Sequence, residues 1–203
     1  MSPLPEALQA ALDEPWRPVR TAGLVAMSLG FSLLFLVALT AEQGWIPLLD
    51  GVNLLFHEAG HPLFGIFGWE TLTILGGTLM QLLVPLVVGI SFWLKRDAYG
   101  TAASGVWGFE NGLNIARYVA DARAQVLPLV GGGEHDWTAL LSQWGCLAQD
   151  LRIAQVIRAT GWLGMAACWV WFAWRWHKGR NIHEIAIGHG LYDAAVFAIA
   201  LYA

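Results

Sequence analysis

The sequence predicts an all-α polytopic membrane protein with about five or six transmembrane helices. Hydrophobic residues make up 57% of the 203 residues and charged residues only 13%, which is about half the charged share of a soluble domain. Several uncharged apolar segments are long enough to cross a bilayer. The 12 tryptophans suit membrane–water interfaces, where an indole ring is favoured. We therefore expect a multi-pass integral protein of the lipid bilayer, placed in the bacterial inner membrane.

Composition also bounds the organisation and the partners. No internal repeat or separate soluble region is visible, so residues 1–203 are expected to form a single integral membrane domain. Residues 1–20 read as a polar lead-in without the apolar core of a cleavable signal. The formal net charge of −4 gives no basic patch, so we expect no nucleic-acid partner.

The first half of the chain contains three apolar segments and, between the last two, a short strand-like segment. Residues 22–40 are uncharged and form the first predicted span. The next segment, about 52–67, is short for a span and carries three ionisable side chains, which must face a protein interior or a wet cavity. Residues 69–77 alternate and contain β-branched side chains, which favours a short strand or a re-entrant element. Residues 78–94 form a further span, interrupted by Pro85.

The second half is less uniform. Residues 99–123 predict a helix with one polar stripe, because polar side chains recur at steps of four, three and four: Glu110, Asn114, Arg117 and Asp121. Pro128 and a run of glycines then end that helix. Asp136 is the predicted N-cap of the next, short helix. Residues 160–176 and 185–203 are the last predicted spans.

One motif in the short segment carries chemistry. His57, Glu58 and His61 form H-E-x-x-H. On a helix the two histidines stack on one face, four residues apart, where two neutral imidazoles bind one cation, usually zinc. Glu58 is placed to accept a proton from a metal-bound water. Three buried polar groups without such a purpose would be costly inside a membrane, so we predict one zinc ion per chain.

A catalytic zinc needs a third protein ligand and an open position for water. The candidates are Asp136, His135 and Asp121. Asp136 precedes a predicted helix, where it could instead be a plain N-cap, and His135 is intrinsically a good ligand. The residues alone leave the choice open.

These residues resemble the site-2 protease family of intramembrane zinc metalloproteases. F-H-E-A-G-H resembles that family's H-E-x-G-H, with Gly60 before the second histidine. G-G-T-L-M-Q-L-L resembles its G-P-x-x-N-L-L element, with Gly77 in the glycine place and Gln81 in the asparagine place. L-P-L-V-G-G-G-E-H-D-W is similar in kind to its proline-containing loop, in which an aspartate at a helix start is the third zinc ligand. The likeness covers about residues 50–136, the predicted metal-site core.

The resemblance implies a distant, atypical member, since Thr78 and Gln81 stand where the family usually has proline and asparagine. It implies a zinc-dependent intramembrane endopeptidase that hydrolyses a peptide bond of a membrane-spanning protein or peptide. It favours Asp136 over His135 as third ligand. Gln81 would hydrogen-bond the substrate or the developing oxyanion, or alternatively join two spans.

Two other functions fit the same residues. A non-proteolytic membrane sensor or adaptor would bind zinc on this scaffold without cleaving anything. A transporter would use the H-E-x-x-H in an ion path, which requires a polar route across several spans. The ionisable residues gather instead around the motif and residues 110–136.

Overall fold

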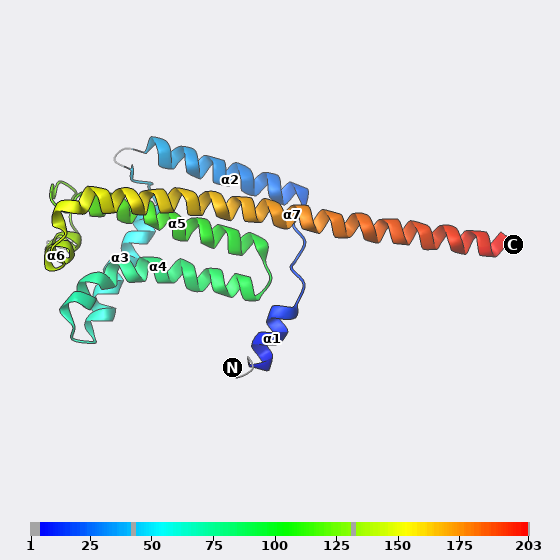
Figure 1. Cartoon of the computed structure of the whole chain (residues 1–203), viewed down its shortest axis with the longest axis horizontal. Helices are drawn as coiled ribbons and strands as arrows, with labels where there is room; N and C mark the ends of the chain where they lie inside the picture. Colours follow the sequence, from blue (N-terminus) through cyan, green and yellow to red (C-terminus); the bar gives the residue numbers. More distant parts are fainter. Residues whose placement is uncertain (1–4, 42–43, 131–132, 203) are drawn as a thin grey trace.

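The computed structural model describes residues 5–41, 44–130 and 133–202, with side chains described through Arg180 except at Ala7. All regular elements in these ranges are helices (Figure 1). In chain order they are α1 (Glu6–Asp13), α2 (Thr21–Thr40), α3 (Leu49–Gly65), α4 (Glu70–Leu94), α5 (Ala98–Ala120), α6 (Asp136–Gln143), the 3-10 turn η2 (Leu147–Gln149) and α7 (Asp150–Tyr202).

Among the described residues, three helices are long and apolar enough to cross a membrane. They are α2, α4 and the segment Leu147–Arg180, most of which belongs to α7. The outer surface of α2 is strongly apolar, since Leu29 and Leu39 are about two-thirds exposed. Apolar surface of this extent suits contact with lipid rather than water. The predicted all-α membrane class is therefore supported in its coarse form.

The predicted five or six spans are not confirmed among the described residues. The segment of α3 has only 17 residues and buries Asp50, Asn53 and His57, and α5 is not among the apolar spans. The predicted span 160–176 lies inside α7. The predicted span 185–203 falls outside the residues whose side chains are described.

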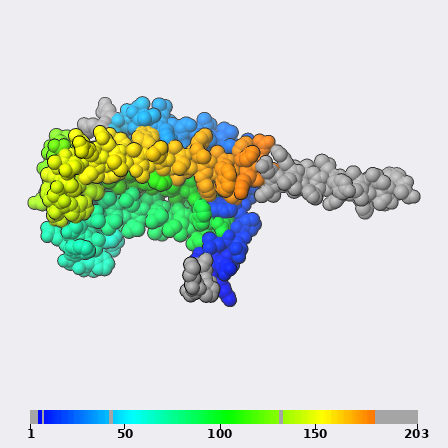
Figure 2. Space-filling model, viewed as in Figure 1, coloured from blue at the N-terminus to red at the C-terminus, as the bar shows by residue number. Residues whose placement is uncertain are grey.

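The helices form a bundle with one crosswise element. Helices α2, α4, α5 and α7 run along a common direction, whereas α3 crosses this direction at the end of the bundle where α6 also lies (Figure 1). In the space-filling view α2 and α7 lie side by side along one face (Figure 2). Small residues let α5 and α7 approach closely, as at Gly112 and Gly161.

The predicted strand over residues 69–77 is wrong, because α4 begins at Glu70. The β-branched residue Thr73 is accommodated in a helix, where its hydroxyl donates to the carbonyl of Trp69. Ile74 and Leu75, adjacent in sequence, both pack on the apolar cluster beneath α6. A helix satisfies its own backbone groups, so in an apolar setting it prevails over local β propensity.

A candidate metal centre

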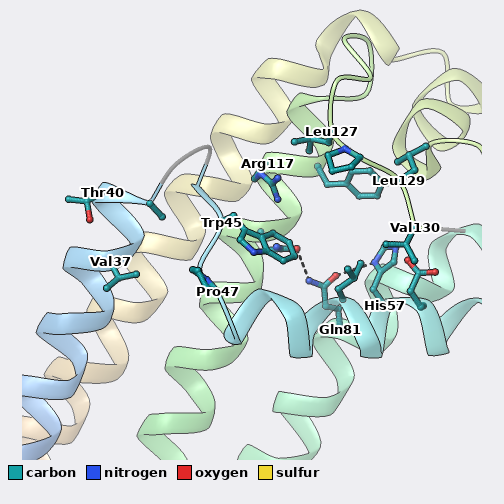
Figure 3. Close-up of a pocket in the computed structure, with 16 residues that line it drawn as sticks. Val37, Thr40, Trp45, Pro47, His57, Gln81, Arg117, Leu127, Leu129 and Val130 are labelled. Atoms are coloured by element: carbon teal, nitrogen blue, oxygen red, sulfur yellow. Dashed lines mark hydrogen bonds between the residues drawn. The ribbon is translucent and has the colours of Figure 1, made fainter. Parts of the chain in front are cut away.

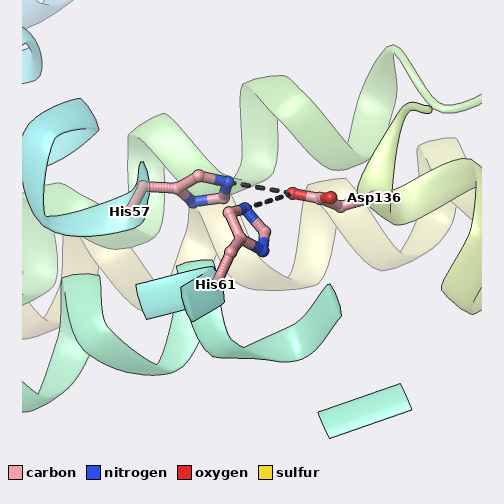
Figure 4. A group of neighbouring side chains, drawn as sticks. All are labelled: His57, His61 and Asp136. Carbon is pink, nitrogen blue, oxygen red and sulfur yellow. Dashed lines mark hydrogen bonds and ion pairs between the residues drawn. The ribbon is translucent and has the colours of Figure 1, made fainter. Parts of the chain in front are cut away.

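Three side chains from two helices converge at the α3 end of the bundle (Figure 4). His57 and His61 lie one helical turn apart on α3, and Asp136 is the first residue of α6. The Oδ2 atom of Asp136 is 2.9 Å from His57 Nε2 and 3.4 Å from His61 Nε2. One potential ligand atom from each residue lies within 4.8 Å of the others. This group could hold a metal ion.

The opposite nitrogen of each imidazole faces an oxygen acceptor. His57 Nδ1 is 3.2 Å from Gln81 Oε1, and His61 Nδ1 is 3.0 Å from the carbonyl oxygen of Thr73. The Gln81 amide in turn donates to Asn114 Oδ1 over 2.9 Å. Each Nδ1 is therefore expected to carry the hydrogen, which leaves each Nε2 lone pair directed at the group.

This arrangement calls for positive charge between the three residues. With Nδ1–H on both rings, the two Nε2 lone pairs and the Asp136 carboxylate face one another, unless protons or a cation lie between them. Zinc bonds to nitrogen and oxygen are about 2.0–2.1 Å, so ligand atoms of a tetrahedral site are about 3.3 Å apart. The two Asp136–histidine distances bracket that separation. These two separations are compatible with a metal ion held between the residues.

Glycines form the wall behind the group. A Cβ atom on Gly77 would lie 2.7 Å from His57 Nε2 and 2.8 Å from His61 Nε2. A Cβ atom on Gly60 would lie 2.1 Å from the carbonyl oxygen of Gly76, so the backbones of α3 and α4 touch here. Only glycine leaves this space for the imidazoles and for an ion between them.

Asp136 reaches the histidines because it is not the N-cap, contrary to the prediction. His135 caps α6, with its Nδ1 accepting from the Thr138 N–H over 3.3 Å. The Asp136 carboxylate is thereby left for the histidines, while its backbone N–H donates to the Tyr118 hydroxyl oxygen over 3.2 Å. Burial opposes ionisation of Asp136, but its interactions with His57 and His61 outweigh that effect and lower the Asp136 pKa.

Neither His135 nor Asp121 belongs to the group. His135 is buried, and its Nε2 lies 3.5 Å from Asp121 Oδ2. Asp121 accepts hydrogen bonds from the backbone N–H groups of Val126 and Leu127, both at 3.0 Å. The contacts of these two residues therefore hold the loop between α5 and α6 in place, and this loop positions Asp136.

Two cavities share lining residues at the group, and Figure 3 shows the residues that line the larger one. The larger has a volume of about 800 Å³ and extends from His57 and Gln81 to Trp45 and the end of α2. The second, of about 730 Å³, extends to His61 and Asp136. Glu58 and Tyr118 line both cavities. Glu58 is thus placed beside His57 and open to both spaces.

The Gln81 side chain lines the larger cavity and is hydrogen-bonded to two other side chains. Both ends of its buried amide are engaged, one by His57 and the other by Asn114. Gln81 therefore orients an imidazole and joins α3, α4 and α5, which matches the alternative reading. Tyr118 was not predicted as a site residue from the sequence. It lies four residues after Asn114 and so shares its helix face, which is the signal that could have indicated it.

Comparison with protein-family models, curated proteins and solved structures gave no match for this chain. The likeness to site-2 proteases remains a prediction from the motifs.

Proposed function

We propose that the protein is a zinc-dependent intramembrane endopeptidase of the multi-pass type. The observation that supports this most directly is the convergence of His57, His61 and Asp136 beside Glu58, at a junction of two cavities. The donor set leaves room for a water molecule, and a carboxylate lies next to one of the histidines. Metal-dependent hydrolysis requires these parts.

His57, His61 and Asp136 would hold the metal, and Gln81 and the Thr73 carbonyl would fix the two rings. Zinc bound there would supply the Lewis acidity that activates a water molecule for hydrolysis. Glu58 accepts the proton of that water as it attacks the scissile carbonyl carbon, and then passes the proton to the leaving amine. The C–N bond breaks, and one water is consumed for each peptide bond.

Tyr118 is the best placed donor for the oxyanion. Its oxygen accepts from the Asp136 N–H, so its own proton remains to be donated toward a cavity that it lines. Donors fixed before the reaction stabilise developing charge more than mobile water does. Gln81 would have to break its hydrogen bonds to His57 and Asn114 before its amide could contact the oxyanion.

The substrate is a membrane-spanning segment that has unwound locally, since a helical backbone shields its peptide bonds. The strand predicted over residues 69–77 is not available to pair with this segment, because residues 70–94 are helical. Apolar residues of the loop after α5, including Leu127, Leu129 and Val130, line the larger cavity instead. They offer an apolar wall to the side chains of an extended segment.

Replacement of Glu58 by glutamine tests the assigned chemistry. Purified full-length protein is reconstituted in liposomes with zinc and a labelled single-span substrate panel. We expect Glu58→Gln to abolish cleavage and to retain zinc, while Glu70→Gln, which changes a carboxylate lining the same smaller cavity, cleaves like the wild type. Cleavage by Glu58→Gln would contradict the role. Stoichiometric zinc without wild-type cleavage of any substrate would favour the sensor or adaptor.

A further inference from the structure

We propose that Arg117 binds a carboxylate of the substrate peptide within the larger cavity and so selects the peptide that reaches the metal group. This inference rests on the proposed function and adds a substrate class to it. The carboxylate belongs to an Asp or Glu side chain or to the peptide's C-terminus. Its carrier is otherwise apolar.

The position of Arg117 on α5 places it near the reacting centre. Arg117 lines the cavity that contains His57 and Glu58 (Figure 3). Its neighbour Tyr118 packs edge-on against the His57 ring, with 5.8 Å between centroids. Asn114, one turn earlier, bonds the amide that holds His57. Residues three apart on a helix have Cβ atoms about 5–6 Å apart, so a group bound at Arg117 lies within a few residues of the scissile bond.

The guanidinium of Arg117 has unused hydrogen-bond capacity. Its Nε is buried and has no hydrogen-bond partner among the described residues. Asp50 and Asp121 attract it electrostatically, but both are engaged elsewhere. Asp50 Oδ2 accepts from the Ile46 N–H over 2.6 Å, and Asp121 accepts from the two loop N–H groups. A partly buried guanidinium with free donors is a ready site for an incoming anion.

The surroundings define what that anion is attached to. The Arg117 guanidinium carbon lies over the Trp45 ring, 5.1 Å from its centroid, so the cation has an aromatic face beside it. The remaining walls are mostly apolar: Val37, Pro47, Leu127, Pro128, Leu129 and Val130. A planar guanidinium matches a carboxylate with two parallel hydrogen bonds. An extended apolar peptide with one carboxylate satisfies both features.

Peptide binding tests this without turnover. Zinc-loaded full-length Glu58→Gln protein in a zwitterionic detergent is titrated with three fluorescein-labelled apolar decapeptides, followed by anisotropy. One has a central Gln and an amidated C-terminus, one has a central Glu instead, and one has the central Gln with a free C-terminus. The two charged peptides distinguish the two sources of the carboxylate. We expect at least one of them to bind about ten-fold more tightly than the neutral peptide.

Added substitutions assign that preference to Arg117. In the Glu58→Gln background, Arg117→Gln should abolish the tighter binding of the charged peptide. Arg117→Lys should keep only part of this difference in affinity, because lysine cannot make the two parallel hydrogen bonds of a planar guanidinium. Arg152→Gln, at an exposed cation of α7 that does not line the cavity, should keep it whole. Zinc content of each variant reports folding, and the Lys variant carries the test if the Gln variant does not fold.

Several results would overturn the inference. These are equal binding of the three peptides, a preference that survives Arg117→Gln, and Arg117→Lys binding like its parent. Equal binding together with Arg117-dependent retention of phosphatidylglycerol would assign the guanidinium to a lipid phosphate. Failure of the wild type to cleave any peptide would contradict the proposed function, but a carboxylate preference that depends on Arg117 would still stand.

Discussion

At the scale of single residues, Gly77 separates the two imidazoles from helix α4. A Cβ at this position would lie within 2.8 Å of both Nε2 atoms, so Gly77→Ala must displace the rings or occupy the space of an ion. We expect zinc affinity to fall about 100-fold or more, measured by competition with a zinc chelator. Gly89→Ala on the same helix meets its nearest neighbour, Ser104 Cβ, at 3.4 Å and should keep wild-type affinity. Unchanged affinity in Gly77→Ala would place the metal elsewhere.

The charges at the group predict a pH dependence. Protonated His61 donates a hydrogen bond to the Asp136 carboxylate, and this bond raises the pKa of His61 above its ordinary 6.5. In the metal-free protein this proton adds stability below pH 6.5, which is lost as the pH rises through the raised folded-state pKa. Zinc must displace the same proton, so its affinity should fall about ten-fold per pH unit below that pKa and level off above it. Constant affinity between pH 8 and pH 5, measured by chelator competition, would contradict the His61 contact.

The histidine pair and Glu58 could be found from the sequence, because H-E-x-x-H is local and helical spacing alone stacks its histidines. The third residue could not be settled. Asp136 and His135 are adjacent, and which of them faces α3 depends on where α6 begins. His135 takes the capping position, which only the packing of the loop against Asp121 and Tyr118 reveals.

At the scale of elements, the crossing of α3 and α4 aligns the site. Gly60 and Gly76 meet backbone to backbone, and Gly60→Ala must push the two helices apart. We expect a loss of about 1–3 kcal/mol in unfolding free energy, measured by denaturation of the metal-free protein in detergent. Gly51→Ala, on the same helix but with nothing within 4 Å, should be neutral or slightly stabilising. Equal stability of the two variants would contradict this contact.

The error over residues 69–77 also belongs to this scale. Alternation over nine residues is compatible with a strand, but the sequence does not show that Gly76 and Gly77 must face α3 while Ile74 and Leu75 face α6. These packing requirements are set by helices α3 and α6, which lie outside residues 69–77 in the sequence. The helix that results also supplies the Thr73 carbonyl and Gln81 to the two histidines.

At the scale of the whole molecule, composition was enough to predict helices and apolar spans but not their number. Helix α5 combines Glu110, Asn111 and Asn114 with small residues and packs between α4 and α7. Helix α5 belongs to the bundle because it is packed between other helices, although its own hydropathy is too low to identify it as a span. Polar residues of α3 and α5 also contact one another, since the Asn53 amide donates to Glu110 Oε2 over 3.0 Å. The long-range contacts that bring residues 57 and 136 together are not visible in any local pattern.

Zinc content tests the central claim most directly. Full-length protein purified in detergent is loaded with zinc, and bound metal is measured beside His57→Ala, Asp136→Ala and His135→Asn. The last variant removes an imidazole but keeps a residue that caps helices well. We predict about one zinc per chain in the wild type and in His135→Asn, and a loss in His57→Ala and Asp136→Ala. Zinc retained by Asp136→Ala but lost from His135→Asn, or absent from the wild type after loading, would contradict the account.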